Sequence, residues 1–261
     1  MKTKNTAAAA LVMLLATLVV GWGPARAEEE KGSLLDSENF SATFTLATDY
    51  VFRGISQTDE KPAVQGSIDY GHPIGIYLGI WGSNVHSDIS KGGVELDYYI
   101  GYARELCSNF NLDLTFFYYS YPGGGSDPEP DYLEGHIGLD YTFATLPLSP
   151  KIGSNYYYSP DFFGEDGDAH YVNGIIELSL PYELTLAGEL GYQDVEGDKL
   201  TGDGQGENGK DGFDYYHWRV GISREILKFV LDLSYQDTNE TSFLGGDIAD
   251  ARVVFSVSRT F

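Results

Sequence analysis

The residues that could do chemistry in this sequence are carboxylates that recur at every second position within apolar stretches. Glu95 and Asp97 form one such group, and Glu134, His136 and Asp140 form another. Acids that share one face of a low-dielectric wall concentrate cations beside it, so the pattern predicts electrostatic selection of cations. The residues expected on that face, with the few bases among them, are Asp49, Arg53, Asp69, Glu95, Asp97, Asp113, Glu134, His136, Asp140, Glu177, Glu189, Arg219 and Asp232.

A structural interpretation of the same charges stays open. The parity that selects these residues also selects Lys151, Glu183, Lys228 and Arg252. A water-facing lining must be polar whatever the protein does, and acids paired with arginines could simply hold a wall together. Asp49 and Arg53 stand four residues apart on one expected strand, so they share a face, and we expect them to brace it rather than to gate it.

Strands must position these residues, because the dominant hydrophobic period is two. Tyr216 and Trp218 alternate with His217 and Arg219, which places apolar and polar side chains on opposite faces. About twelve such segments follow one another, an even number as in bacterial outer-membrane barrels. They are expected at 40–52, 63–70, 75–84, 94–104, 109–120, 132–143, 149–158, 171–180, 183–194, 213–224, 228–237 and 250–261.

The connections between these segments alternate between short and long. Short ones are expected at 71–74, 105–108, 144–148, 181–182 and 225–227, and long ones at 121–131, 159–170, 195–212 and 238–249. This layout predicts an all-β fold, a transmembrane antiparallel up-and-down β-barrel with short periplasmic turns and long acidic extracellular loops. A soluble two-sheet sandwich would also alternate, but aromatic girdles near the segment ends and the terminal Phe261 favour the barrel.

Side chains could narrow the interior of a barrel of this size. Eight strands are filled by side chains and about sixteen leave an aqueous channel, so twelve lie between these cases. The aromatic residues expected to point inward are Tyr77, Trp81, Tyr99, Phe117, Tyr119 and Tyr157.

The N-terminal part of the chain predicts export. Residues 1–27 combine Lys2 and Lys4, an apolar run and an Ala25-Arg26-Ala27 cleavage pattern, so we expect a cleaved signal peptide. Residues 28–39 are expected to form a short acidic periplasmic segment, and residues 40–261 a single barrel domain. The expected location is the outer membrane of a Gram-negative bacterium.

Composition excludes several other classes of protein. The 39 acidic residues outnumber 16 basic ones, which argues against a nucleic-acid partner. The single cysteine, Cys107, rules out a disulfide framework and a thiolate metal site, and no cofactor is expected. Residues 204–211 read GQGENGKD, but this loop lacks the serine or threonine and the following helix that a phosphate loop needs. A loose divalent-cation site there, bridging to lipopolysaccharide, stays open.

The stretch from residue 47 to residue 85 carries a family resemblance. It reads ATDYVFRGISQTDEKPAVQGSIDYGHPIGIYLGIWGSNV, and its specific parts are DYVFRG from Asp49, Ser56-Gln57 and PAVQG from Pro62. It resembles the opening of the TorF-type porin family, also described as conserved Gcw-type outer-membrane proteins. Beyond residue 104 the resemblance rests on strand rhythm and a few glycine and aromatic positions. It implies an outer-membrane location and a porin, and it names no substrate.

These expectations combine into one function with two alternatives. The expected function is a porin-like channel for passive, cation-preferring diffusion of small cationic or neutral solutes. Its expected partners are outer-membrane lipid and lipopolysaccharide, and the barrel assembly machinery. One alternative is a closed structural or adhesive barrel acting through its acidic loops. The other is an outer-membrane lipid hydrolase, which is disfavoured because no serine is placed beside His136 or His217.

Overall fold

The computed structural model describes residues 36–125, 128–197, 212–239 and 247–261. The expected signal peptide at 1–27 and the loop motif at 204–211 lie outside these residues, as does most of the expected N-terminal segment 28–39. The helices of the described part are short 3-10 turns, η1 (Ser37–Asn39), η2 (Pro181–Glu183) and η4 (Asp247–Ala249). None of the helices described here is long and apolar enough to cross a membrane.

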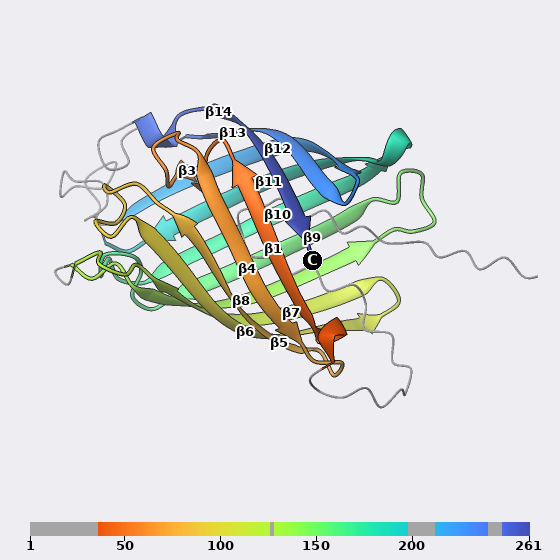
Figure 1. Cartoon of the computed structure of the whole chain (residues 1–261), viewed down its shortest axis with the longest axis horizontal. Coiled ribbons are helices and arrows are strands. Elements are labelled where there is room, and N and C mark those ends of the chain that lie inside the picture. Colours follow the sequence, from red (N-terminus) through yellow and green to blue (C-terminus); the bar gives the residue numbers. More distant parts are fainter. Residues whose placement is uncertain (1–35, 126–127, 198–211, 240–246) are drawn as a thin grey trace, which may run out of the picture.

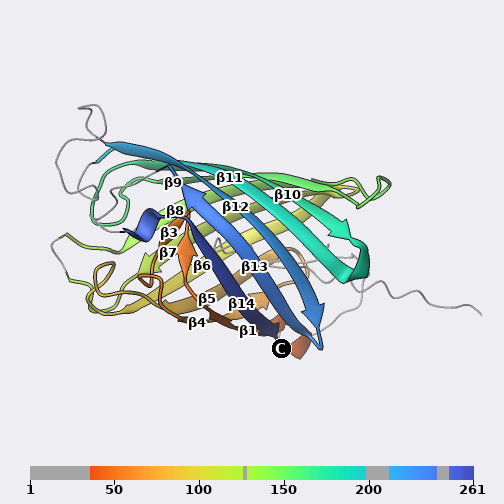
Figure 2. The ribbon, with the colours of Figure 1, turned by 90° about the horizontal axis from the view of Figure 1, so that it is seen from above.

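Twelve antiparallel strands close into a barrel, and the closure pairs the first strand with the last (Figures 1 and 2). The all-β barrel expected from the alternation is therefore confirmed. Each strand pairs with its neighbour in sequence, so the topology is up and down. The strands are β1 (Phe40–Ala47), β4 (Ala63–Gly71), β5 (Ile76–Asn84), β6 (Val94–Cys107), β7 (Phe110–Ser120), β8 (Tyr132–Thr142), β9 (Lys151–Ser159), β10 (Ala169–Leu180), β11 (Leu184–Val195), β12 (Phe213–Ile226), β13 (Phe229–Thr238) and β14 (Arg252–Thr260).

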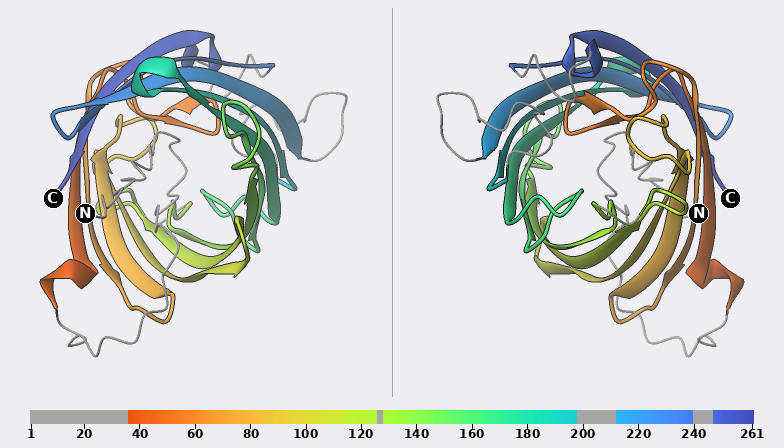
Figure 3. Two further views of the ribbon diagram at one scale, coloured as in Figure 1. Left: turned by 90° about the vertical axis from the view of Figure 1, so that its right-hand side faces the viewer. Right: turned by 90° about the vertical axis from the view of Figure 1, so that its left-hand side faces the viewer.

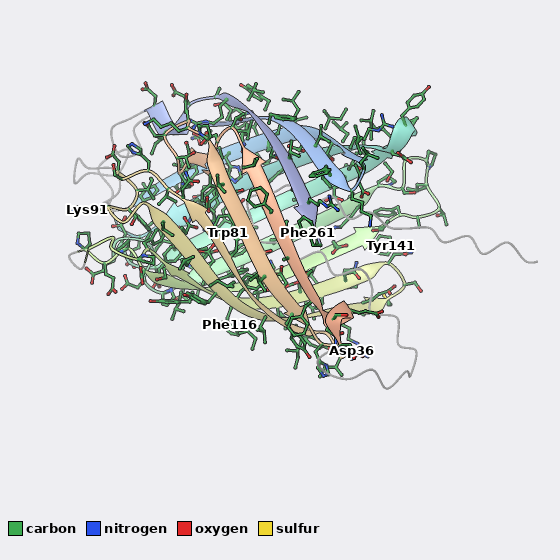
Figure 4. The ribbon with its side chains drawn as sticks, viewed as in Figure 1. Asp36, Trp81, Lys91, Phe116, Tyr141 and Phe261 are labelled. Atoms are coloured by element: carbon green, nitrogen blue, oxygen red, sulfur yellow. The ribbon has the colours of Figure 1, made fainter. Side chains whose placement is uncertain are left out.

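The outer face of the wall is apolar and exposed. Phe116 is 71% exposed and Leu190 is 59% exposed although both lie within strands, and Phe116 points away from the barrel (Figure 4). Arg259 also lies on this face, and its guanidinium sits 4.7 Å from the ring centroid of Phe261 and 5.0 Å from that of Phe229. Large apolar side chains are stable in such numbers on the outer face only if they contact lipid, as in transmembrane barrels.

The connections differ at the two ends of the barrel. Turns of two to eight residues lie at one end, and connections of nine to seventeen residues lie at the other. In the β12–β13 turn Leu227 and Lys228 both have positive φ, as a type I′ two-residue hairpin turn requires. Lys228 is exposed in this turn, and Glu183 is exposed in η2. Neither residue lines the wall, so the parity that placed them on the inner face was wrong there.

The first long connection folds into the barrel. The expected strand 40–52 is wrong at its end, because β1 stops at Ala47. Residues 48–62, here called the lumen hairpin, contain β2 (Val51–Phe52) and β3 (Ile55–Ser56), which pair only with each other. Arg53 and Gly54 form the tip with φ of 48° and 86°, the left-handed geometry of a tight hairpin turn. Figure 3 shows this orange segment inside the ring of strands.

Candidate functional site in the barrel lumen

The residues that sequence parity selected lie in two zones of the interior. In the half nearer the long loops, Asp49, Arg53, Glu95, Asp97, Glu134, His136 and Arg219 are all buried. Toward the short turns, Asp69 and Asp232 are buried, whereas Asp113, Asp140, Glu177 and Glu189 are partly exposed. The interior is therefore packed at the loop end and more open to water at the turn end.

Arg53, at the tip of the lumen hairpin, reaches the far wall. Its Nη2 donates to Glu134 Oε2 on β8 at 2.8 Å, and its Nη1 donates to Gln193 Oε1 on β11 at 2.8 Å. Both strands are distant from β1 in the order around the ring. Burial alone would lower the pKa of Arg53, but the Glu134 carboxylate together with the phenols of Tyr119, Tyr132 and Tyr171 offsets this, and the pKa is raised. The hairpin thus crosses the lumen and carries its charge into an ion pair.

Aromatic rings enclose the same guanidinium. Its central carbon lies 4.1 Å from the ring centroid of Tyr171, 4.9 Å from that of Tyr157 and 4.6 Å from that of Phe52. Tyr171 and Tyr157 belong to β10 and β9, which lie between the strands of the two acceptors. Four adjacent strands therefore form one cage around Arg53, and this arrangement stabilises a buried cation.

The base of the lumen hairpin is held by Asp49. Its carboxylate accepts hydrogen bonds from the hydroxyls of Ser56 and Thr58, each at 2.7 Å, and pairs with Arg252 Nη1 at 3.1 Å. The expected brace between Asp49 and Arg53 is not formed, because Arg53 lies in a turn rather than on β1. Each of the two residues instead ties the hairpin to a different part of the wall.

The middle of the lumen hairpin contacts the wall near β1. The hydroxyl of Tyr50 donates to Glu95 Oε1 at 2.9 Å, and the Tyr50 ring meets Trp81 edge-on at 5.2 Å between centroids. At the tip, a Cβ added to Gly54 would lie 2.5 Å from Thr238 Cγ2 and 2.6 Å from His217 Cβ. Only glycine fits between the hairpin and this side of the barrel.

Aromatic side chains fill more of the loop end. Tyr119 stacks on Tyr132 at 4.3 Å between centroids, and Phe162, from the loop after β9, packs on Tyr132 at 4.9 Å. Phe163 from the same loop packs edge-on against Tyr121 at 5.2 Å. Together with the lumen hairpin, these rings pack the interior at this level.

Carboxylates toward the turn end are held by neutral donors. The hydroxyls of Tyr77 and Tyr99 donate to Asp113 and Asp69, and that of Tyr171 donates to Glu189 at 3.0 Å. Across the described residues, seven inward acids have no ion pair with lysine or arginine. They are Asp69, Glu95, Asp97, Asp113, Asp140, Glu177 and Glu189. The inner surface therefore keeps an excess of negative charge after its salt bridges are formed.

A further ion pair braces the wall. Arg219 on β12 pairs with Asp232 on β13 at 2.7 Å, and both side chains are buried. The structural interpretation of the charges therefore applies to part of the set. Among the described residues, no group of three metal-binding side chains comes together.

His136 occupies a polar network rather than a nucleophile pair. Its Nε2 lies 3.0 Å from Asn155 Oδ1, its Nδ1 lies 3.4 Å from Thr115 Oγ1 and 3.5 Å from Asp113 Oδ1, and its ring stacks on Tyr157 at 4.3 Å. No serine hydroxyl bonds to it in the part of the chain that the structure covers. The geometry gives no support to the hydrolase alternative at this residue.

The sequence pattern did not single out two neutral members of the cage, Gln193 and Tyr171, or the hairpin residue Tyr50. Each of the three contacts a charged residue of the expected set. Parity alone would have placed Gln193 and Tyr171 on the inner face. A period of two, however, does not distinguish an amide or phenol that binds a charge from one that only lines the wall.

A closed twelve-stranded wall, apolar outside and charged inside, defines a porin-type β-barrel. The chain belongs to the family described as a bacterial protein of unknown function (Gcw_chp), whose profile matches residues 35–261. This match gives no support to the TorF-type name that the opening resemblance suggested. No curated protein matches the chain by sequence.

Two solved porins share the fold. The KdgM porin, in complex with disordered oligogalacturonate, aligns with a TM-score of 0.54 at 12% identity over 85% of this chain and 99% of that one. The NanC porin aligns with a TM-score of 0.53 at 10% identity over 85% of this chain and 98% of that one. At such identities the likeness concerns the architecture alone.

Proposed function

We propose that this protein is an outer-membrane channel that passes small solutes by diffusion and prefers cations. The observation that supports this most directly is the set of seven inward carboxylates without a lysine or arginine partner in the described wall. A negative lining inside a low-dielectric wall raises the local concentration of cations and lowers that of anions.

The lumen hairpin is the element that limits this pathway. Its strands β2 and β3 pair only with each other and are not part of the barrel ladder, so its tip can shift without breaking a hydrogen bond between barrel strands. Its backbone bonds the wall at the root, where Thr48 N–H donates to Phe255 O on β14. Beyond the root its wall contacts include the ion pairs Arg53–Glu134 and Asp49–Arg252. Solute passage at the loop end therefore depends on how firmly these contacts hold the hairpin.

The same proposal includes the location and the processing of the chain. The leader at 1–27 directs export, the segment 28–39 lies in the periplasm, and the barrel sits in the outer membrane of a Gram-negative bacterium. The barrel assembly machinery inserts it, and the acidic loops meet lipopolysaccharide through divalent cations. N-terminal sequencing of the protein recovered from outer-membrane fractions tests the processing site.

A salt gradient across a planar bilayer tests the channel and its preference together. The refolded chain without residues 1–27 should give steady conductance with a reversal potential on the cation side. Asp140→Asn should reduce the cation-to-anion permeability ratio, by about twofold, because it removes one unpaired inward charge. Glu183→Gln is the matched control, since Glu183 is exposed in the η2 turn. An anion-sided reversal potential would contradict the cation preference.

The packed loop end favours a second candidate, a closed barrel that acts through its loops. The lumen hairpin spans the interior, and Tyr119, Tyr132 and Phe162 are buried beside it. This candidate predicts silence in the bilayer for the wild type and for variants with a loosened hairpin. It also predicts that deletion of residues 198–211 abolishes attachment to a surface or partner while the barrel still folds.

A further inference from the structure

The cage around Arg53 is made almost entirely by the barrel wall. Glu134 and Gln193 supply two acceptors, and Tyr157 and Tyr171 supply two ring faces, from strands β8 to β11. From the lumen hairpin itself, only Phe52 approaches the guanidinium. We propose that these wall residues form a binding site for guanidinium-bearing solutes, which Arg53 occupies as an internal substitute. The inference rests on the proposed channel and names a solute class for it.

The two acceptors fit the planar shape of a guanidinium. Nη2 bonds the Glu134 carboxylate and Nη1 bonds the Gln193 amide oxygen, both at 2.8 Å. A guanidinium carries its donors in one rigid plane, so it can satisfy two fixed acceptors and still present its faces to aromatic rings. A primary ammonium is a compact point charge and does not combine these contacts in the same way.

The rings of the cage are held in place without Arg53. The hydroxyl of Tyr171 donates to Glu189 at 3.0 Å and lies 2.8 Å from His217 Nε2, and Tyr157 stacks on His136. These neighbours lie on the wall strands, so the ring positions do not depend on the hairpin. A preformed site of this kind loses little conformational entropy when a ligand enters.

Withdrawal of the lumen hairpin would leave the Glu134 carboxylate without its counter-ion. The Glu134 side chain is 1% exposed, and Arg53 is its ion-pair partner. A buried carboxylate that loses its partner is strongly destabilised, so another cation is favoured in its place. Arg53 Nε has no hydrogen-bond partner, which shows that the two Nη contacts and the rings are what hold the group. A small guanidinium compound can make all of these wall contacts.

Chemical complementation of an Arg53→Ala chain tests the site. Methylguanidinium is the probe. Methylurea is its neutral counterpart of similar shape, and methylammonium carries the charge but has no planar group. Calorimetric titration of the refolded mature chain should show that Arg53→Ala binds methylguanidinium at least about tenfold more tightly than either comparator. The wild type, whose cage is occupied, should bind it at least about tenfold more weakly than the variant. Equal binding of methylguanidinium and methylurea, or equal binding by variant and wild type, would overturn the inference.

Second-site variants locate the binding. Adding Glu134→Gln to Arg53→Ala should weaken methylguanidinium binding at least about tenfold, because the charged acceptor is lost. Adding Glu183→Gln instead should leave binding unchanged, since Glu183 is exposed in the η2 turn outside the cage. Binding that survives Glu134→Gln would place the probe elsewhere and overturn the inference. Heat-modifiable gel mobility checks folding, and Arg53→Gln replaces Arg53→Ala if the latter does not fold.

Calorimetry and conductance separate the two proposals. Methylguanidinium binding by Arg53→Ala without any channel current would retain the cage and refute the channel. If Arg53→Ala conducts, but methylguanidinium neither reduces the current nor binds to the variant, the channel is retained and the cage is refuted. Current that the probe reduces in the single variant, but not after Glu134→Gln is added, supports both.

Discussion

Arg252 Nη1 lies 3.1 Å from Asp49 Oδ2, and this contact joins residues 203 positions apart in the sequence. Both side chains are only 6% exposed. The contact ties the root of the lumen hairpin to the start of the last strand, next to the seam where the barrel closes. Arg252 also donates to the backbone oxygens of Asp247 and Asp250, so one side chain orders the end of the last loop and the hairpin together.

Removal of one partner of this pair should destabilise the protein. We expect Arg252→Ala to lower the free energy of unfolding by about 3–5 kcal/mol, because the buried Asp49 carboxylate loses its counter-charge. The combined variant Asp49→Asn and Arg252→Ala should be less destabilised than the sum of the single changes. Urea unfolding in lipid vesicles measures the cycle. Additive effects would show that the pair is not coupled.

The tip of the lumen hairpin should not tolerate a side chain. Gly54→Ala adds a Cβ within 2.6 Å of His217 Cβ at a φ of +86°, so we expect the tip to be displaced and the bilayer conductance to rise. Gly125→Ala is the matched control, because Gly125 also has a positive φ, of +116°, but no atom lies within 4 Å of its added Cβ. The same conductance change in both variants would attribute it to backbone strain in general.

A charged side chain on the outer face should destabilise the protein. Phe116 is 71% exposed in the middle of β7. Phe116→Arg should therefore lower the free energy of unfolding in vesicles by about 2–4 kcal/mol if the residue faces the bilayer centre. Phe116→Leu keeps the surface apolar and should cost much less. Folding of both variants into vesicles, measured in buffers of increasing ionic strength, provides the check. No difference between arginine and leucine here would argue against a lipid contact.

The ring of Phe261 should matter for assembly more than for stability. The backbone of Phe261 exchanges hydrogen bonds with Ala42, at 2.9 Å and 3.3 Å, which any residue could form. We therefore expect Phe261→Ala to refold normally in vitro but to reach the outer membrane in a smaller fraction of molecules. Thr260→Ala serves as the control in the same fractionation. Equal yields of the two variants in the membrane would show that the ring is not read during insertion.

The strand pattern made most of the fold predictable, because lipid outside and charge inside force a period of two. The strand starting at Ala63 and the strand Tyr132–Thr142 lie within one residue of their expected bounds. The largest departure is at the end of β1, where alternation in the sequence continues through Tyr50 and Phe52 after the wall strand has stopped. Val51 and Phe52 form the short strand β2 of the lumen hairpin, so periodicity does not separate a wall strand from a short strand inside the barrel.

The site was less predictable than the fold. Parity gave Glu134 and Arg53 as inward residues, but their pairing joins positions 81 residues apart across the interior. Such a contact depends on the length and path of the lumen hairpin, which neighbouring residues do not encode. The hairpin also places Arg53 away from Asp49, and this is why the expected brace between them was wrong.

The path of Arg53 has a consequence for the order of folding. Its partners Glu134 and Gln193 come much later in the chain, and the hairpin root needs Arg252 from the final strand. A ribosome delivers residues 48–62 before any of these partners exist. The interior can therefore be completed only after the last strand meets the first, so ring closure and docking of the tip form a late, coupled step in biogenesis.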